Sequence, residues 1–106
     1  MTPINTARTP IKVGNEPQTI VVTPNSKTAY VSNLSGTVTP IDTATNTAGK
    51  PIKVGTEPYQ MAITLNGKTI YVGNYGSGTV TPITVATSTA GTPIRPAASQ
   101  DGLRLP

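Results

Sequence analysis

Short apolar segments separated by turn residues run along the whole chain, and none has the 3.6-residue spacing of an amphipathic helix. Residues 59–64 are almost continuously apolar, which is typical of a strand that is packed on both faces. Threonine and valine fill many of the other positions, and both are β-branched residues that favour extended backbone. The pattern predicts four strands in this part of the chain, at residues 59–64, 69–73, 79–84 and 93–95.

Turn residues separate these predicted strands. Asn66-Gly67 predicts a type I′ hairpin turn, in which both central residues have positive φ. Residues 75–78 predict a looser turn, and residues 88–91 predict a loop. We therefore expect an antiparallel four-stranded unit.

The same pattern occurs twice. Residues 10–50 (repeat 1) align with residues 51–92 (repeat 2) when Gly76 is treated as a single insertion, and 26 of the 41 aligned positions are identical. The alignment carries the four strands over to residues 18–23, 28–32, 37–42 and 51–54, with a weaker hairpin signal at Asn25-Ser26. Partial copies occupy residues 1–9 and 93–106.

A repeat of about 41 residues with four strands in each unit is typical of β-propeller blades. Such a unit cannot bury its own apolar face and must stack on a neighbour. The sequence therefore predicts one all-β domain over residues 1–106. It would consist of tandem four-stranded antiparallel blades, about two of them complete, with partial blades at each end.

The repeat also resembles a known family. Tyr30-Val31-Ser32-Asn33 and Tyr71-Val72-Gly73-Asn74 are each followed by Gly-Thr-Val, and the first copy continues into Ile-Asp-Thr-Ala-Thr and Pro-Ile-Lys-Val-Gly. This pattern resembles the YVTN β-propeller repeat over almost the whole chain. The resemblance implies a propeller in an exported or cell-surface protein, with no shared catalytic motif. Residues 1–8 contain no apolar run of the secretory type, so the chain itself carries no export signal.

Two prolines depart from the expected pattern. Pro40 and Pro82 stand within the third predicted strand of each repeat. Because proline has no backbone N–H, we expect this edge of the sheet to pair poorly with the fourth strand.

Composition argues against several functions. The chain has a net charge of +4 and no cluster of basic residues. A nucleic-acid partner is therefore not expected, although weak binding to nucleic acid or an anionic surface is kept as a second alternative. No segment has the length of a membrane span.

The residues of most catalytic sites are missing. The chain has no histidine and no cysteine, and its serines lack an evident activating base. We expect no enzyme activity, no cofactor and no bound metal. The alternative is a carboxylate-based or metal-dependent enzyme fragment, similar to the lactonases among related propellers, that uses Glu16 and Glu57.

Blade topology predicts which residues share a rim. The turn between the second and third strands and the crossing to the next blade lie at one end of a blade, whereas the hairpins of Lys27 and Lys68 lie at the other. We expect Tyr30 and Tyr71 to pack between blades. The candidate binding residues on the first rim are Asn15, Glu16, Asn33, Glu57, Tyr59, Asn74 and Tyr75.

These features favour a non-catalytic binding module or cell-surface scaffold. An open stack of blades would expose two apolar faces, so we expect either self-association or a longer propeller that contains this chain. The expected ligand of the rim is a protein or a glycan.

Overall fold

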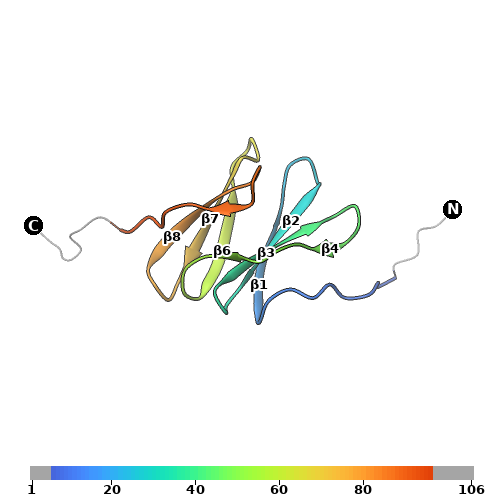
Figure 1. Ribbon diagram of the computed structural model, residues 1–106, viewed down its shortest axis with the longest axis horizontal. Coiled ribbons are helices and arrows are strands. Elements are labelled where there is room, and N and C mark those ends of the chain that lie inside the picture. The colour runs from blue at the N-terminus through green and yellow to red at the C-terminus, as the bar shows by residue number, and fades with distance from the viewer. Residues whose placement is uncertain (1–5, 97–106) are drawn as a thin grey trace, which may run out of the picture.

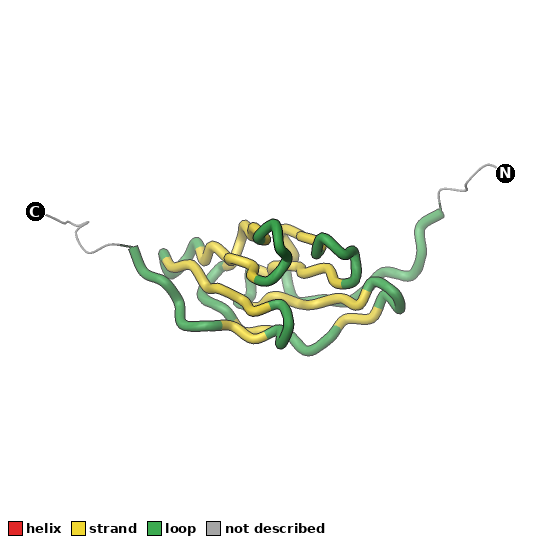
Figure 2. The backbone as a smooth tube through the Cα atoms, turned by 90° about the horizontal axis from the view of Figure 1, so that it is seen from above, coloured by secondary structure: helices red, strands yellow, loops and turns green. Residues whose placement is uncertain are grey.

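The computed structural model describes residues 6–96 as two antiparallel sheets that stand side by side (Figure 1). The first sheet, blade 1, contains β1 (Pro17–Val22), β2 (Thr28–Asn33), β3 (Thr37–Asp42), β4 (Thr47–Ala48) and β5 (Ile52–Lys53). The second sheet, blade 2, contains β6 (Pro58–Ile63), β7 (Thr69–Asn74), β8 (Thr79–Thr84) and β9 (Thr89–Ala90). These residues form only strands and loops (Figure 2), which confirms the all-β prediction. Within residues 6–96, no helix is long and apolar enough to cross a membrane.

The two repeats fold in the same register. Tyr30 of β2 lies opposite Pro40 of β3, and the equivalent Tyr71 of β7 lies opposite Pro82 of β8. Side chains alternate between the two faces of a strand, so equivalent residues of the repeats point the same way in both blades. The structure confirms that the duplicated sequence encodes equivalent sheets.

The hairpin turns differ from the prediction. Gly67 has a positive φ of 72°, whereas Asn66 does not, so the predicted type I′ turn is wrong. The backbone N–H of Gly67 donates to the carbonyl of Thr64, which is the bond of a type I turn within a four-residue loop. The Asn66 side chain favours this turn because its Oδ1 accepts bonds from the Thr64 hydroxyl and the Lys68 N–H.

The edge of β3 that faces away from β2 is interrupted at Pro40, as predicted. The strand β4 pairs with Ile41 and Asp42, whereas β5 pairs with Thr37 and Val38. The Pro40 carbonyl accepts a bond from Gly49 on this side, so the missing N–H of Pro40 also faces this edge. Two short strands therefore share the edge.

The same edge of blade 2 corrects two predictions. The predicted loop at residues 88–91 contains the strand β9, which pairs with the end of β8. The predicted strand at residues 93–95 is reduced to one bridge, between Ile94 and Val80. The partial repeats at residues 1–5 and 97–106 lie outside the described residues.

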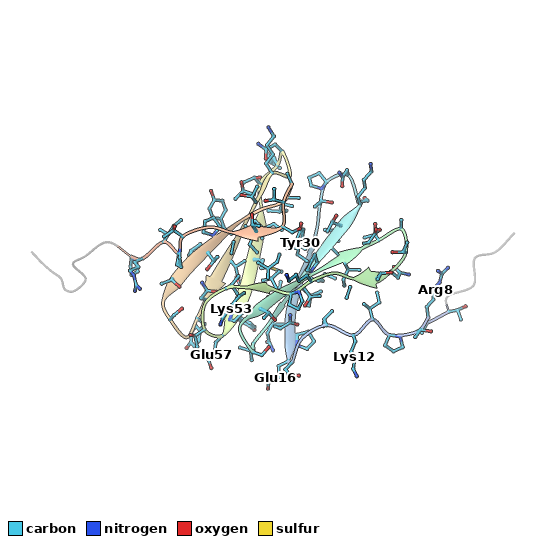
Figure 3. The ribbon with its side chains drawn as sticks, viewed as in Figure 1. Arg8, Lys12, Glu16, Tyr30, Lys53 and Glu57 are labelled. Carbon is cyan, nitrogen blue, oxygen red and sulfur yellow. The ribbon has the colours of Figure 1, made fainter. Side chains whose placement is uncertain are left out.

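The main core lies between the two blades. Tyr30 is only 1% exposed and lies between the sheets (Figure 3), and its hydroxyl lies 3.2 Å from the Ser88 hydroxyl of blade 2. Ser32 donates from its hydroxyl to the carbonyl of Tyr59 over 2.7 Å. The buried residues of this core are Tyr30, Val38, Ile52, Ile70, Val72 and Ile83.

Each blade also has an outer face that points away from its neighbour. On blade 1, Ile11 and Val13 pack against part of this face. On blade 2, Tyr71 is 43% exposed although the equivalent Tyr30 is buried. The prediction of packing between blades is confirmed for Tyr30 and wrong for Tyr71, because no blade follows blade 2 in the described chain.

We expect Tyr30→Ala to lower the free energy of unfolding by about 3–5 kcal/mol, because it leaves a cavity between the blades. Tyr30→Phe should cost only about 0.5–1.5 kcal/mol, since it removes one hydrogen bond. Urea denaturation measures both. Leu65→Ala is the control because Leu65 is 98% exposed. If all three variants unfolded alike, the core would not lie between the blades.

Candidate functional site

The predicted rim is assembled by backbone hydrogen bonds between a crossing segment and a turn. In blade 1 the N–H of Leu34 donates to the carbonyl of Glu16 over 3.0 Å. In blade 2 the N–H of Tyr75 donates to the carbonyl of Glu57 over 2.9 Å, and Gly76 donates to Thr56. The crossing segment and the turn are therefore held together at the same end of each blade.

Glu16 and Glu57 both occupy left-handed backbone, with φ of 54° and 51°. Such a conformation is uncommon for residues other than glycine and costs on the order of 1–3 kcal/mol. Both repeats have it at the same place, so it belongs to the crossing between blades. The two exposed side chains lie along the lower edge of the molecule in Figure 3.

The Glu57 carboxylate lies directly over the inserted glycine of repeat 2. A Cβ atom on Gly76 would stand 2.6 Å from Glu57 Oε1, which is closer than real contacts allow. Because glycine has no Cβ, the exposed Glu57 carboxylate can lie against the turn at Gly76.

Asn33 and Asn74 lie inside the protein, although the sequence placed them among the candidate binding residues. The amide of Asn74 donates to the hydroxyls of Thr79 and Thr81, and its Oδ1 accepts from the N–H of Gly55 over 3.1 Å. The amide of Asn33 donates to the hydroxyls of Thr37 and Thr39. Asn74 therefore binds the strands of blade 2 to the crossing segment, and Asn33 binds strands of blade 1 to each other. Neither side chain is exposed to a ligand.

The other candidate residues are exposed. Asn15 lies on the crossing into blade 1, and Tyr59 and Tyr75 lie in blade 2. The two tyrosines border a hollow of about 410 Å³ on the outer face of blade 2. Its remaining lining residues are Gln60, Gly73, Asn74, Gly78, Thr79 and Val80.

The equivalent place on blade 1 is filled. There Ser32, the counterpart of Gly73, bonds to the carbonyl of Tyr59, and the neighbouring Pro58 is fully buried. The start of β6 thus covers the surface around Ser32 on blade 1. The equivalent surface around Gly73 on blade 2 is uncovered in the described chain. The hollow therefore lies at the place on blade 2 that corresponds to the covered place on blade 1.

Within residues 6–96, no three acidic, histidine or cysteine side chains come together in a group that could hold a metal ion. Neither Glu16 nor Glu57 is therefore part of such a group in this part of the chain.

The hairpins with Lys27 and Lys68 lie together at the other end of the blades. A Cβ atom on Gly67 would stand 2.9 Å from Cδ of Pro24, so the two hairpins are in contact. Leu65 is also part of these hairpins.

Sequence reasoning predicted that apolar outer faces would exist but did not say which residues form them. Ile20 and Val22 of β1 are exposed on one side, and Val80 and Ile94 are exposed on the other. The alternation of side chains along each strand, combined with the repeat alignment, would have identified these residues.

Solved structures, among them WD40 repeats and a β-propeller domain, contain a similar arrangement. A hydrazine synthase from Kuenenia stuttgartiensis matches 74% of this chain with 28% identity and a TM-score of 0.71, over 23% of its own chain. The WD40 repeats of RRP9 match 82% with 13% identity and a TM-score of 0.73, over 28% of theirs. The β-propeller domain of Cps50 (Swd1) from Myceliophteria thermophila matches 82% with 11% identity and a TM-score of 0.70, over 27% of its chain.

These matches show the fold of the chain. The described sheets are blades of a β-propeller, and the chain spans about a quarter of each of these matched structures. No family model matches the sequence, and no curated protein is similar to it.

We expect Gly55→Ala to lower the free energy of unfolding by about 1–3 kcal/mol, as overpacking does in well-packed sites. The added Cβ would stand 2.6 Å from Cγ of the buried Asn74. Gly73→Ala is the control, because its Cβ would meet nothing closer than 3.6 Å. Thermal or urea unfolding compares the two variants, and equal losses would show that the Asn74 cluster is loosely packed.

Proposed function

We propose that this chain is a non-catalytic binding or scaffold module, in which a rigid pair of propeller blades presents a rim of loops to a protein or glycan partner. The observation that carries the proposal is the rim itself. Its loops are tied to the crossing segments by backbone bonds such as that from Tyr75 to Glu57. Binding residues are commonly found on loops that a rigid frame positions.

Tyr75 is the main contact residue in this proposal. Its side chain is 83% exposed although its backbone is fixed by a hydrogen bond. A tyrosine offers a large apolar surface and a polar hydroxyl, and it loses little conformational entropy on binding. Glu57 and Tyr59 lie nearby on the same rim and supply charge and further ring surface.

The absence of catalytic chemistry in the sequence supports the non-catalytic part of the proposal. The chain has no histidine or cysteine to act as a base or nucleophile near neutral pH. The resemblance to the YVTN repeat supports the same view and favours an exported or cell-surface protein. Its outer faces would be covered by further blades, from another copy or from a longer propeller.

Rim binding is tested with Tyr75→Ala. A glycan array and a library of displayed peptides, probed with the labelled chain, should yield ligands whose binding falls at least tenfold in this variant. Leu65→Ala removes an equally exposed apolar side chain from the other end of the blades and should bind as the unmodified chain does. Ligands that ignored Tyr75→Ala, or an empty screen, would contradict the proposal.

A second measurement addresses the carboxylate alternative. We expect the melting temperature to be the same with calcium, with magnesium and with EDTA, because Glu16 and Glu57 form no metal-binding group in the described chain. A cation-dependent rise that Glu57→Gln abolished would favour a metal site. Lactone hydrolysis lost in the same variant would show that the chain is an enzyme.

A further inference from the structure

The two outer faces are equivalent to the two faces that meet between blade 1 and blade 2. Toward blade 2, blade 1 presents Tyr30 and Val38, whose counterparts on the outer face of blade 2 are Tyr71 and Val80. In return, blade 2 presents Ile63, whose counterpart on the outer face of blade 1 is Val22. The outer face of blade 2 is therefore equivalent to the face of blade 1 that blade 2 covers. The outer face of blade 1 is equivalent to the face of blade 2 that covers it, so the two outer faces are complementary.

The last strand position of blade 2 is paired over a shorter length than that of blade 1. On blade 1, Ile52 is 7% exposed and the N–H of Val54 donates to the carbonyl of Gly36. On blade 2, the equivalent Ile94 exchanges two backbone hydrogen bonds with Val80, and its side chain is 52% exposed because no blade covers this face in the described chain. Pro96 stands at the position of Val54 and has no N–H to donate. One bridge, between Val80 and Ile94, is what remains of the pairing.

Another segment of the chain matches this position better. Residues 10–14 have the same sequence, Pro-Ile-Lys-Val-Gly, as residues 51–55, which contain the paired strand β5. In the described structure residues 10–14 belong to no sheet, although Ile11 and Val13 already pack against the outer face of blade 1. They lie as a fourth strand would lie if the preceding blade were present.

A buried polar atom marks the same incomplete contact. Asn74 Oδ1 accepts a bond from Gly55, whereas Asn33 Oδ1 is buried and has no hydrogen-bond partner. Gly14, the counterpart of Gly55, is already beside Asn33, since a Cβ on Gly14 would stand 2.7 Å from Asn33 Cγ. Pairing of residues 11–12 with a sheet would fix this segment as β5 is fixed, and would bring the Gly14 N–H to Asn33 Oδ1.

We propose that a second copy of this chain docks with the outer face of its blade 1 on the outer face of blade 2. Its residues 10–14 add to β8 as the fourth strand and replace the chain's own residues 93–95. Its Pro17 enters the hollow beside Tyr59, as Pro58 does between the blades of one chain. This proposal rests on the one above that further blades cover the outer faces.

The contact uses two different faces, so each docked copy still offers one free face, and both free faces are covered only when the assembly closes into a ring. Propellers have about four to eight blades, which corresponds to about two to four copies of a two-bladed chain. Light scattering after size exclusion should give a discrete mass in this range. A monomer at every concentration, or aggregates without a discrete mass, would overturn the proposal.

Complementary variants test the two faces. Val22→Lys damages the outer face of blade 1 and Val80→Lys that of blade 2, and both side chains are exposed, so both variants should fold. Each alone should be a monomer, whereas their mixture should form a dimer through the two intact faces. Leu65→Lys should leave the ring intact. A mixture that stayed monomeric, or a single variant that still formed a dimer, would refute contact between unlike faces.

A reversible disulfide tests the strand exchange. The chain has no cysteine, so Val80→Cys with Ile94→Cys introduces a single pair. The Cα atoms of such a bridged pair lie about 5.5 Å apart, within the range that a disulfide spans. The oxidised protein should be a monomer because its own segment is locked onto β8, and reduction should restore the ring. A ring that persisted after oxidation would overturn the exchange.

Failure of this inference can be told apart from failure of rim binding. A monomer that still bound its ligand through Tyr75 would leave the binding module in place and remove only the second copy as the covering partner. A ring that found no ligand would do the reverse.

Discussion

Burial of one blade's apolar face by the next is the constraint on which this structure depends. A four-stranded sheet of this size has two faces, and the main core of the protein lies between sheets. Tyr30 is buried because blade 2 covers it, and Tyr71 is exposed because nothing in the described chain does the same for blade 2. One side chain in two equivalent positions thus has two environments, and the difference comes from the neighbour alone.

The same constraint explains the arrangement of polar groups. Asn74 bonds the crossing segment at Gly55 to the strands of blade 2, so the entry into this blade is fixed by an amide of the blade itself. The crossing itself requires left-handed backbone at Glu16 and Glu57. The stacked blades, the crossing segment and the rim are therefore linked by the same set of contacts. The exposed loops are held in place by the buried contact between the blades.

Much of the fold could be predicted from the sequence because the same pattern of strands and turns occurs in both repeats. The break at Pro40 could be predicted from the missing N–H alone. Hairpin geometry could not, because Asn66-Gly67 fits more than one turn and the loop length decides between them. Within the candidate site, the rim followed from topology, whereas the burial of Asn33 and Asn74 depends on threonine hydroxyls several residues away.

Proline within the third strand has a consequence for solubility. A long unbroken strand edge is a template on which foreign chains add and aggregate. Pro40 divides the edge of β3 into two short stretches, each only two residue pairs long, and Pro82 stands at the same place in β8. The chain's own short strands β4 and β5 occupy these stretches, and a foreign strand that displaced one of them could pair over only a few residues. The interrupted edge therefore suits short segments and resists growth into fibrils.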